Sequence, residues 1–258
     1  MKYQSDDSRN RIYISHLLPD KEMKELIEET GVGVESIDFS ISENLDHLSE
    51  SVNSYKKRMK EIGTENLLLH GPFLDLNPVA FDSEILRVTK LRFAQAYSAA
   101  QELGAKKIVY HTCYHPDIYY LIGWADRMAS FFHEFLEERS EIDVVMENVF
   151  DRQWQPLLDV KRKVQETNFA LCLDIGHANC YSHLPVTEWV KKLFPYIEHM
   201  HVHDNMGEKD SHLALGQGSI EIEKVFKKVK KSKCTYTIEC NTKDDVRESW
   251  RKLKGLLE

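Results

Sequence analysis

The residues of greatest chemical interest in this 258-residue sequence are acidic and histidine side chains that each stand at the end of a short apolar run. Six consecutive runs end in such a residue, namely His70, His111, Glu147, Asp174, His201 and Glu239. Three carboxylates brought together without Lys or Arg would repel one another and resist burial unless a positive charge neutralised them. A divalent cation supplies that charge, and mixed oxygen and imidazole ligands suit Mn²⁺, Zn²⁺, Fe²⁺ or Co²⁺ better than Ca²⁺. The pattern therefore predicts a metal site.

Further polar residues lie close to these positions in the sequence, namely His177, His203, Asp210 and His212. Asp210 and His212 are two apart, so an extended stretch would point both side chains toward the same metal ion or substrate hydroxyl. The alternative is that Asp210 is an ordinary turn residue and His212 an exposed one. His203 would share a strand face with His201 and could replace it as a ligand if the register differs from the one expected.

Secondary-structure elements must bring these residues together, and the hydrophobic pattern predicts eight strands and eight helices. Apolar or β-branched runs predict strands at 12–16, 34–39, 66–70, 107–111, 143–147, 169–174, 197–203 and 235–239. Helical periodicity predicts helices near 20–29, 49–61, 83–103, 117–139, 155–166, 186–194, 220–230 and 244–256. This alternation favours an α/β fold, a single (βα)8 TIM barrel over residues 11–258 with a polar lead at 1–10.

A doubly wound open sheet is the structural alternative to the barrel. It would be expected to have a glycine-rich turn after the first strand, whereas the run at 12–18 leads directly into Pro19. In a barrel the ends of all parallel strands meet on one rim, where active sites are found. The barrel therefore explains why the acidic and histidine side chains stand at strand ends.

The composition excludes several classes of protein. With 34 Lys and Arg against 42 Asp and Glu, the formal charge is −8, which argues against a protein that coats DNA. No apolar run is long enough to cross a membrane and residues 1–10 are polar, so we expect a cytoplasmic protein without a membrane partner. Five cysteines without CxxC spacing fit reduced thiols better than a disulfide framework or a zinc knuckle.

Three stretches carry a resemblance to a known family, namely 173–177 (Leu-Asp-Ile-Gly-His), 201–204 (His-Val-His-Asp) followed by 210–213 (Asp-Ser-His-Leu), and 215–218 (Leu-Gly-Gln-Gly). At these residues the chain resembles the xylose isomerase-like barrel superfamily, which groups sugar isomerases and epimerases with endonuclease IV, the second family of abasic-site endonucleases. The resemblance extends from about residue 34 to residue 241. In the isomerases and epimerases one metal ion is held from the last four strands, which implies the ligands Glu147, Asp174, His201 and Glu239.

The resemblance to endonuclease IV implies a different metal site. Those enzymes hold up to three zinc ions, and the additional ligands would be His70, His111, His177, Asp210 and His212. Two departures favour the sugar enzyme. Bulky Phe150 and Trp154 stand where endonuclease IV has a small, glycine-rich loop, and the densest basic run, at 224–233, is expected at the end of the barrel opposite the rim.

We therefore predict a metal-dependent isomerase or epimerase that acts on a sugar or sugar phosphate, with a multi-zinc phosphodiesterase acting on abasic DNA as the alternative. Glu147 and Glu239 would be the catalytic bases that move a proton next to a carbonyl through an enediolate. Substrate contacts are expected from His70, His111, His177, His203, Trp154 and Phe73. The expected cofactor is one divalent ion (Mn²⁺, Zn²⁺, Co²⁺ or Mg²⁺) for the isomerase and up to three Zn²⁺ for the hydrolase.

Overall fold

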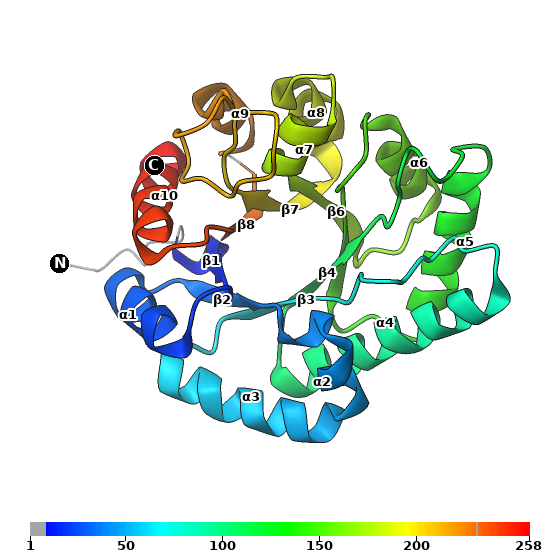
Figure 1. The fold of residues 1–258 in the computed structure, drawn as a ribbon, viewed down its shortest axis with the longest axis horizontal. Helices are drawn as coiled ribbons and strands as arrows, with labels where there is room; N and C mark the ends of the chain where they lie inside the picture. The colour runs from blue at the N-terminus through cyan, green and yellow to red at the C-terminus, as the bar shows by residue number, and fades with distance from the viewer. Residues whose placement is uncertain (1–8, 231) are drawn as a thin grey trace.

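The computed structural model describes residues 9–230 and 232–258, and within them eight parallel strands close into a barrel in chain order. Figure 1 shows this ring of strands from one end, with the helices arranged around its outside. The predicted α/β barrel is thus confirmed. The strands are β1 (Ile12–Ser15), β2 (Gly33–Ser36), β3 (Leu67–His70), β4 (Lys107–His111), β5 (Asp143–Glu147), β6 (Phe169–Asp174), β7 (Ile197–Val202) and β8 (Thr235–Ile238).

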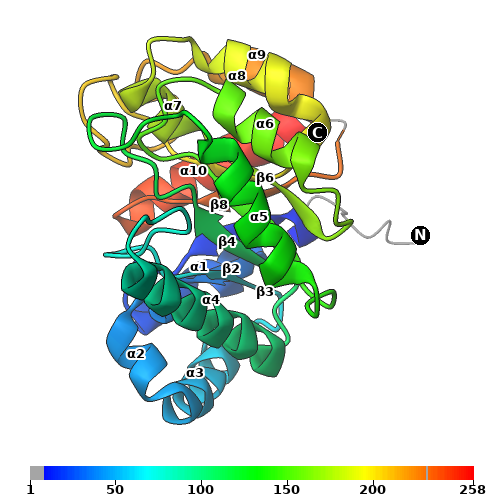
Figure 2. The same cartoon turned by 90° about the vertical axis from the view of Figure 1, so that its right-hand side faces the viewer.

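Ten α-helices are present in the described ranges. They are α1 (Asp20–Thr30), α2 (Ser42–Asp46), α3 (Leu48–Ile62), α4 (Ser83–Leu103), α5 (Trp124–Leu136), α6 (Gln155–Lys163), α7 (Ile175–Tyr181), α8 (Val186–Leu193), α9 (Ile222–Val229) and α10 (Lys243–Leu257). Short 3-10 helices occur at Arg9–Arg11, Asp38–Ser40 and Phe194–Tyr196. Figure 2 gives the side view, in which the loops that follow the strands project to the left. None of the helices in these ranges is both long and apolar enough to span a membrane.

Several predicted boundaries differ from the structure. The helix predicted at 117–139 begins only at Trp124, because Gly123 adopts a left-handed conformation with φ 65° that interrupts the helix before it. The strand predicted at 34–39 ends at Ser36, and Phe39 lies in a 3-10 turn. The predicted polar lead at 1–10 falls mostly on residues 1–8, which lie outside the described residues.

Helix α7 was not predicted, and it positions part of the rim. It starts directly after β6, and the Asp174 carboxylate accepts a hydrogen bond from the His177 backbone N–H at 2.7 Å as the cap of its first turn. The same carboxylate remains available to other groups through its second oxygen, Oδ2, which lies 3.2 Å from His203 Nε2. The cap therefore fixes Asp174 and His177 relative to each other.

Candidate metal centre

The strand register brings the predicted strand-end residues together on one rim. His111 of β4 is paired with Glu147 of β5, and Asp174 of β6 with His201 of β7. Glu239 follows the last residue of β8 directly. All of these side chains except that of His111 are buried. The rim therefore holds imidazoles and carboxylates in direct contact, largely out of water.

A first group forms around one oxygen of Glu147. The Nε2 atoms of His70 and His111 lie 3.0 Å apart, and each lies 3.4 Å from Glu147 Oε2. Ligand atoms placed around a tetrahedral metal ion at bond lengths of roughly 2.0–2.1 Å are separated by about 3.4 Å. The three atoms thus have the spacing of ligands that share one ion.

A second group forms around the other oxygen of Glu147. Its Oε1 lies 3.2 Å from His201 Nδ1, and the same nitrogen lies 3.8 Å from Asp174 Oδ2 and 3.6 Å from Glu239 Oε1. These are the four ligands that the resemblance to sugar isomerases implied. Because Glu147 contributes one oxygen to each group, its carboxylate joins the first group to the second.

A third group centres on Asp210. Its Oδ2 lies 3.2 Å from His177 Nε2 and 3.3 Å from His212 Nε2. His177 Nδ1 also lies 3.3 Å from Glu147 Oε1, so the third group adjoins the second. The nine residues predicted as ligands of a multinuclear site therefore fall into three neighbouring groups.

The backbone fixes which nitrogen of three histidines carries a proton. His70 Nδ1 lies 2.8 Å from the Gly71 carbonyl, His177 Nδ1 3.1 Å from that of Asn148, and His212 Nδ1 2.8 Å from that of Glu239. A carbonyl can only accept, so each Nδ1 donates its proton there. When the ring is neutral, its Nε2 carries the lone pair on the side that faces a carboxylate, which is the usual arrangement of a histidine that binds a metal. Without a metal, a proton at Nε2 makes this contact instead.

His201 is oriented by a carboxylate that the sequence analysis missed. Glu35 of β2 is fully buried inside the barrel, and its Oε1 lies 3.0 Å from His201 Nε2. Its Oε2 accepts the Thr237 hydroxyl at 2.5 Å and lies 3.0 Å from His199 Nε2. The signal in the sequence was an acidic residue inside an apolar run that was predicted to be a strand.

Buried atoms without hydrogen bonds test whether these residues fit a metal ion. In the described part of the chain, Glu147 Oε2, His201 Nδ1 and Asp210 Oδ1 are buried and make no hydrogen bond. Such atoms are costly unless another partner satisfies them. Each belongs to one of the three groups, so the residues fit divalent metal ions at these positions.

The electrostatics of the rim are set by burial and by the mutual charges of its members. Burial alone would raise the pKa of Glu147, but His201 and His111 hold that pKa well below its ordinary value. Burial lowers the pKa of His111 to about 4, so this imidazole is neutral and able to bind a metal. Burial opposes ionisation of His212, yet its contact with Asp210 raises the pKa of His212 to about 9.

The residues predicted to contact substrate take different places. Phe73 stacks on His111 with ring centroids 4.3 Å apart. His203 is fully buried, with Nε2 3.2 Å from Asp174 Oδ2 and Nδ1 3.6 Å from Asp210 Oδ1, so it lies between the second and third groups. Trp154 packs against the hydrophobic core at the start of α6, with the Lys192 ammonium 5.1 Å from its ring centroid.

A cavity of about 420 Å³ opens beside the first and third groups. His111, His177 and Asp210 belong to its wall. Its remaining lining residues are Phe73, Leu74, Asp75, Leu76, Cys113, Tyr114, His115, Val149, Phe150 and Tyr181. A molecule in this cavity would therefore contact two of the three groups.

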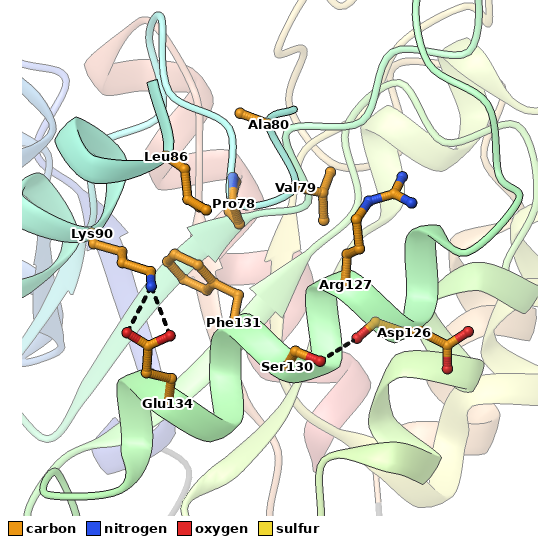
Figure 3. A pocket seen from close by; sticks show the side chains of 10 residues that line it. All are labelled: Pro78, Val79, Ala80, Leu86, Lys90, Asp126, Arg127, Ser130, Phe131 and Glu134. Atoms are coloured by element: carbon orange, nitrogen blue, oxygen red, sulfur yellow. Dashed lines mark hydrogen bonds and ion pairs between the residues drawn. The ribbon is translucent and has the colours of Figure 1, made fainter. Parts of the chain in front are cut away.

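A second cavity, of about 300 Å³, lies between α4 and α5 and has a different character (Figure 3). Leu86 and Phe131 point into it, and an ion pair with the Lys90 ammonium 2.6 Å from Glu134 Oε1 forms one wall. None of the metal-ligand groups of the rim takes part in its lining. We assign it to packing between the two helices.

Comparisons with known proteins agree with this fold. A family model described as xylose isomerase-like TIM barrel matches residues 25–257. The uncharacterised protein MJ1311 of Methanocaldococcus jannaschii is 29% identical over 203 residues, covering 74% of this chain and 69% of the relative.

Solved structures show the same barrel. A D-tagatose 3-epimerase-like protein is 24% identical with a TM-score of 0.77, covering 96% of this chain and 97% of its own. The TTHB071 protein of Thermus thermophilus, from a crystal soaked with ZnCl₂, is 21% identical with a TM-score of 0.80, covering 95% and 97%. An endonuclease IV of the same organism is 17% identical with a TM-score of 0.67, covering 96% and 98%. At these identities the likeness establishes the fold alone.

Proposed function

The chain belongs to the xylose isomerase-like TIM barrel family, and we propose that within it the protein is a phosphoester hydrolase that uses more than one divalent metal ion. One observation carries the proposal. Glu147 directs Oε2 toward two histidines of the first group and Oε1 toward His201 of the second, so its carboxylate is suited to hold two ions at once. Neighbouring ions bridged by a carboxylate are typical of enzymes that cleave phosphoesters.

The roles of the chain's own residues follow from their contacts. Divalent ions bound in the three groups would polarise the phosphoryl oxygens and make water a stronger nucleophile. Glu147 would hold the first two groups at a fixed separation, while His177 and His212 would orient Asp210 in the third. The backbone carbonyls that contact Nδ1 of His70, His177 and His212 would keep the Nε2 atoms of these residues oriented for binding ions.

The overall reaction balances without any further reactant. The oxygen of water forms a bond to phosphorus, and the bond between phosphorus and the alcohol oxygen of the substrate breaks. One proton of the water ends on the released alcohol. A phosphate monoester gives an alcohol and inorganic phosphate, and a diester gives an alcohol and a phosphate monoester.

A sugar isomerase or epimerase with a single metal ion is the second candidate, and one observation favours it. Glu147 Oε1 and Glu239 Oε1 both approach His201 Nδ1, at 3.2 and 3.6 Å, as two bases beside one ion would. This reaction requires Glu147 to keep an oxygen free for the proton. The two histidine nitrogens 3.4 Å from Oε2 count against it, because an ion held between them and Oε2 would engage the second oxygen of Glu147 as well.

Metal content and reaction class together test the proposal. The purified protein is analysed for metals and then assayed with phosphomonoesters, phosphodiesters and an abasic DNA duplex, before and after treatment with a chelator. We expect more than one ion per chain, up to three, and hydrolysis that the chelator abolishes and zinc restores. A single ion per chain, together with exchange of a ketose α-proton in D₂O and no hydrolysis, would overturn the proposal in favour of the isomerase.

A further inference from the structure

We propose, on the basis of the proposed function, that the substrate is a small phosphoester whose organic group carries an uncharged aromatic ring, and that the 420 Å³ cavity beside the metal-ligand groups binds that ring. The position of the cavity and the side chains of its walls indicate the chemistry of this organic group.

The position of the cavity decides what part of a substrate it can hold. His111 of the first group and Asp210 of the third both line it. A phosphoryl group held by ions in these groups would leave its organic substituent inside the cavity. A volume of about 420 Å³ is typical of sites for small molecules.

The walls of the cavity are rich in aromatic side chains. Besides its histidines, four rings line it, those of Phe73, Tyr114, Phe150 and Tyr181. Of its lining residues in the described part of the chain, none is Lys or Arg, and two are Asp. A second phosphate or a carboxylate on the organic group would find no Lys or Arg partner there and would face Asp75 instead.

Three of these rings are held in place by contacts with other rings. Phe150 and Tyr181 meet edge to face, with centroids 4.9 Å apart and planes at 68°. Phe73 is held in another part of the wall by stacking on His111. Phe150 is 38% exposed, so part of its surface is free for contact with a ligand. Aromatic groups gain from both stacked and edge-to-face contacts, which favours an aryl group or a nucleobase over a flexible polyol.

The absence of Lys and Arg from the described lining also decides between a small molecule and a nucleic acid strand. A strand would require such side chains for the phosphates next to the one being cleaved. The described lining offers histidines and two aspartates instead. We therefore place the ring on a free small molecule, and binding of a single-stranded oligonucleotide becomes an outcome of the test.

Non-hydrolysable phosphonates allow the contributions of the phosphoryl group and of the organic group to binding to be measured separately. Methylphosphonate, cyclohexylphosphonate and phenylphosphonate are titrated into the zinc-loaded full chain by calorimetry. We expect phenylphosphonate to bind about tenfold more tightly than methylphosphonate and more tightly than cyclohexylphosphonate. In Phe150→Leu, which keeps an apolar side chain but loses the ring, the preference for phenylphosphonate should fall toward unity while the affinity for methylphosphonate is retained.

An aromatic residue outside the cavity provides a matched control. Phe81→Ala removes an aromatic ring that is 80% exposed and lies outside the cavity, so it should leave all three affinities unchanged. Equal affinities for the three phosphonates, or a preference that survives Phe150→Leu, would overturn this inference alone. A short oligonucleotide that binds more tightly than phenylphosphonate would also overturn it. If no phosphonate binds to the zinc-loaded protein, both this inference and the proposed function fail.

Discussion

Carboxylates on the outer helices and carboxylates on the rim of the barrel have different partners for their negative charge. On the outside they pair with Lys or Arg, as Glu29 does with Arg247 at 2.7 Å and Glu134 with Lys90 at 2.6 Å. On the rim, within the described residues, the basic side chains that contact Glu147, Asp174 and Asp210 are histidines only.

The difference shows what each region is suited to do. In an exposed pair the two charges neutralise each other, so the pair contributes little to stability and leaves no site for a further ion. The rim can take up a further ion, because four of its histidines each turn one ring nitrogen toward the backbone or Glu35 and the other toward a carboxylate, where a metal ion can replace a proton. They are His70, His177, His201 and His212. A cation from solution can bind between these carboxylates and histidines, whereas a Lys or Arg in the same place would occupy the site permanently.

The largest effect is expected from Glu147→Gln, which keeps the size of the side chain but removes its charge. We expect the loss of the ions of the first and second groups and a fall in activity of more than about 100-fold, because the residue belongs to both groups. Metal analysis and steady-state kinetics provide the measurement. Glu134→Gln on the outer surface is the control. Retention of the parent metal content in Glu147→Gln would contradict the bridging role.

Glu35→Gln tests whether the buried carboxylate behind the rim supports metal binding. The amide cannot hold the His201 proton as a carboxylate does, so zinc affinity should fall about 10–100-fold while the barrel stays folded. Competition with a chromophoric chelator measures the affinity, and circular dichroism checks the fold. The partly exposed Glu25, paired with Lys243 at 2.5 Å, supplies the control Glu25→Gln. Unchanged zinc affinity in Glu35→Gln would remove Glu35 from the metal centre.

Asp151 differs from the carboxylates of both regions, because it is buried and forms no ion pair among the described residues. Its Oδ2 accepts the Thr112 hydroxyl at 2.7 Å and the Val149 N–H at 3.1 Å, and burial raises its pKa to about 6. A pKa that folding raises contributes stability below the unfolded value near 3.8, and this contribution is lost as the pH rises through about 6.

It follows that Asp151→Asn should stabilise the metal-free protein at pH 8 by about 1–2 kcal/mol, with a smaller difference at pH 5. The neutral amide avoids a buried charge and can still accept both hydrogen bonds through its oxygen. Urea unfolding at the two pH values gives the measurement. An equal effect of the substitution at pH 5 and pH 8 would show that ionisation of Asp151 is not the cause.

The smallest effect is expected on the outer surface. Arg247→Ala removes the pairs with Glu29 and Asp244 and should lower the free energy of unfolding by less than about 1 kcal/mol, with no change in zinc affinity. Unfolding curves at low and high salt provide the test, because salt should reduce the difference further. A larger loss that is independent of salt would mean that packing of the Arg247 stem dominates.

Much of the fold could be read from periodicity. The eight apolar runs and their alternation with amphipathic segments predicted the barrel, and the ends of β4, β5 and β6 match the predicted residues. The interruption at Gly123 and the early end of β2 were not predicted, because a single backbone conformation decides each of them. Helix α7 was not predicted, because it follows β6 without an intervening loop.

The residue types at the strand ends could be identified from the order of residues along the chain, because each apolar run and the polar residue that ends it are neighbours in sequence. How these residues combine depends on the tertiary structure. The division of nine side chains into three groups, the bridging position of Glu147 and the contact of Glu35 with His201 depend on closure of the barrel. Glu35 and His201 are 166 residues apart, and no local pattern fixes a distance across a closed ring of strands. The aromatic cavity likewise arises from loops of several strands that meet only in the folded chain.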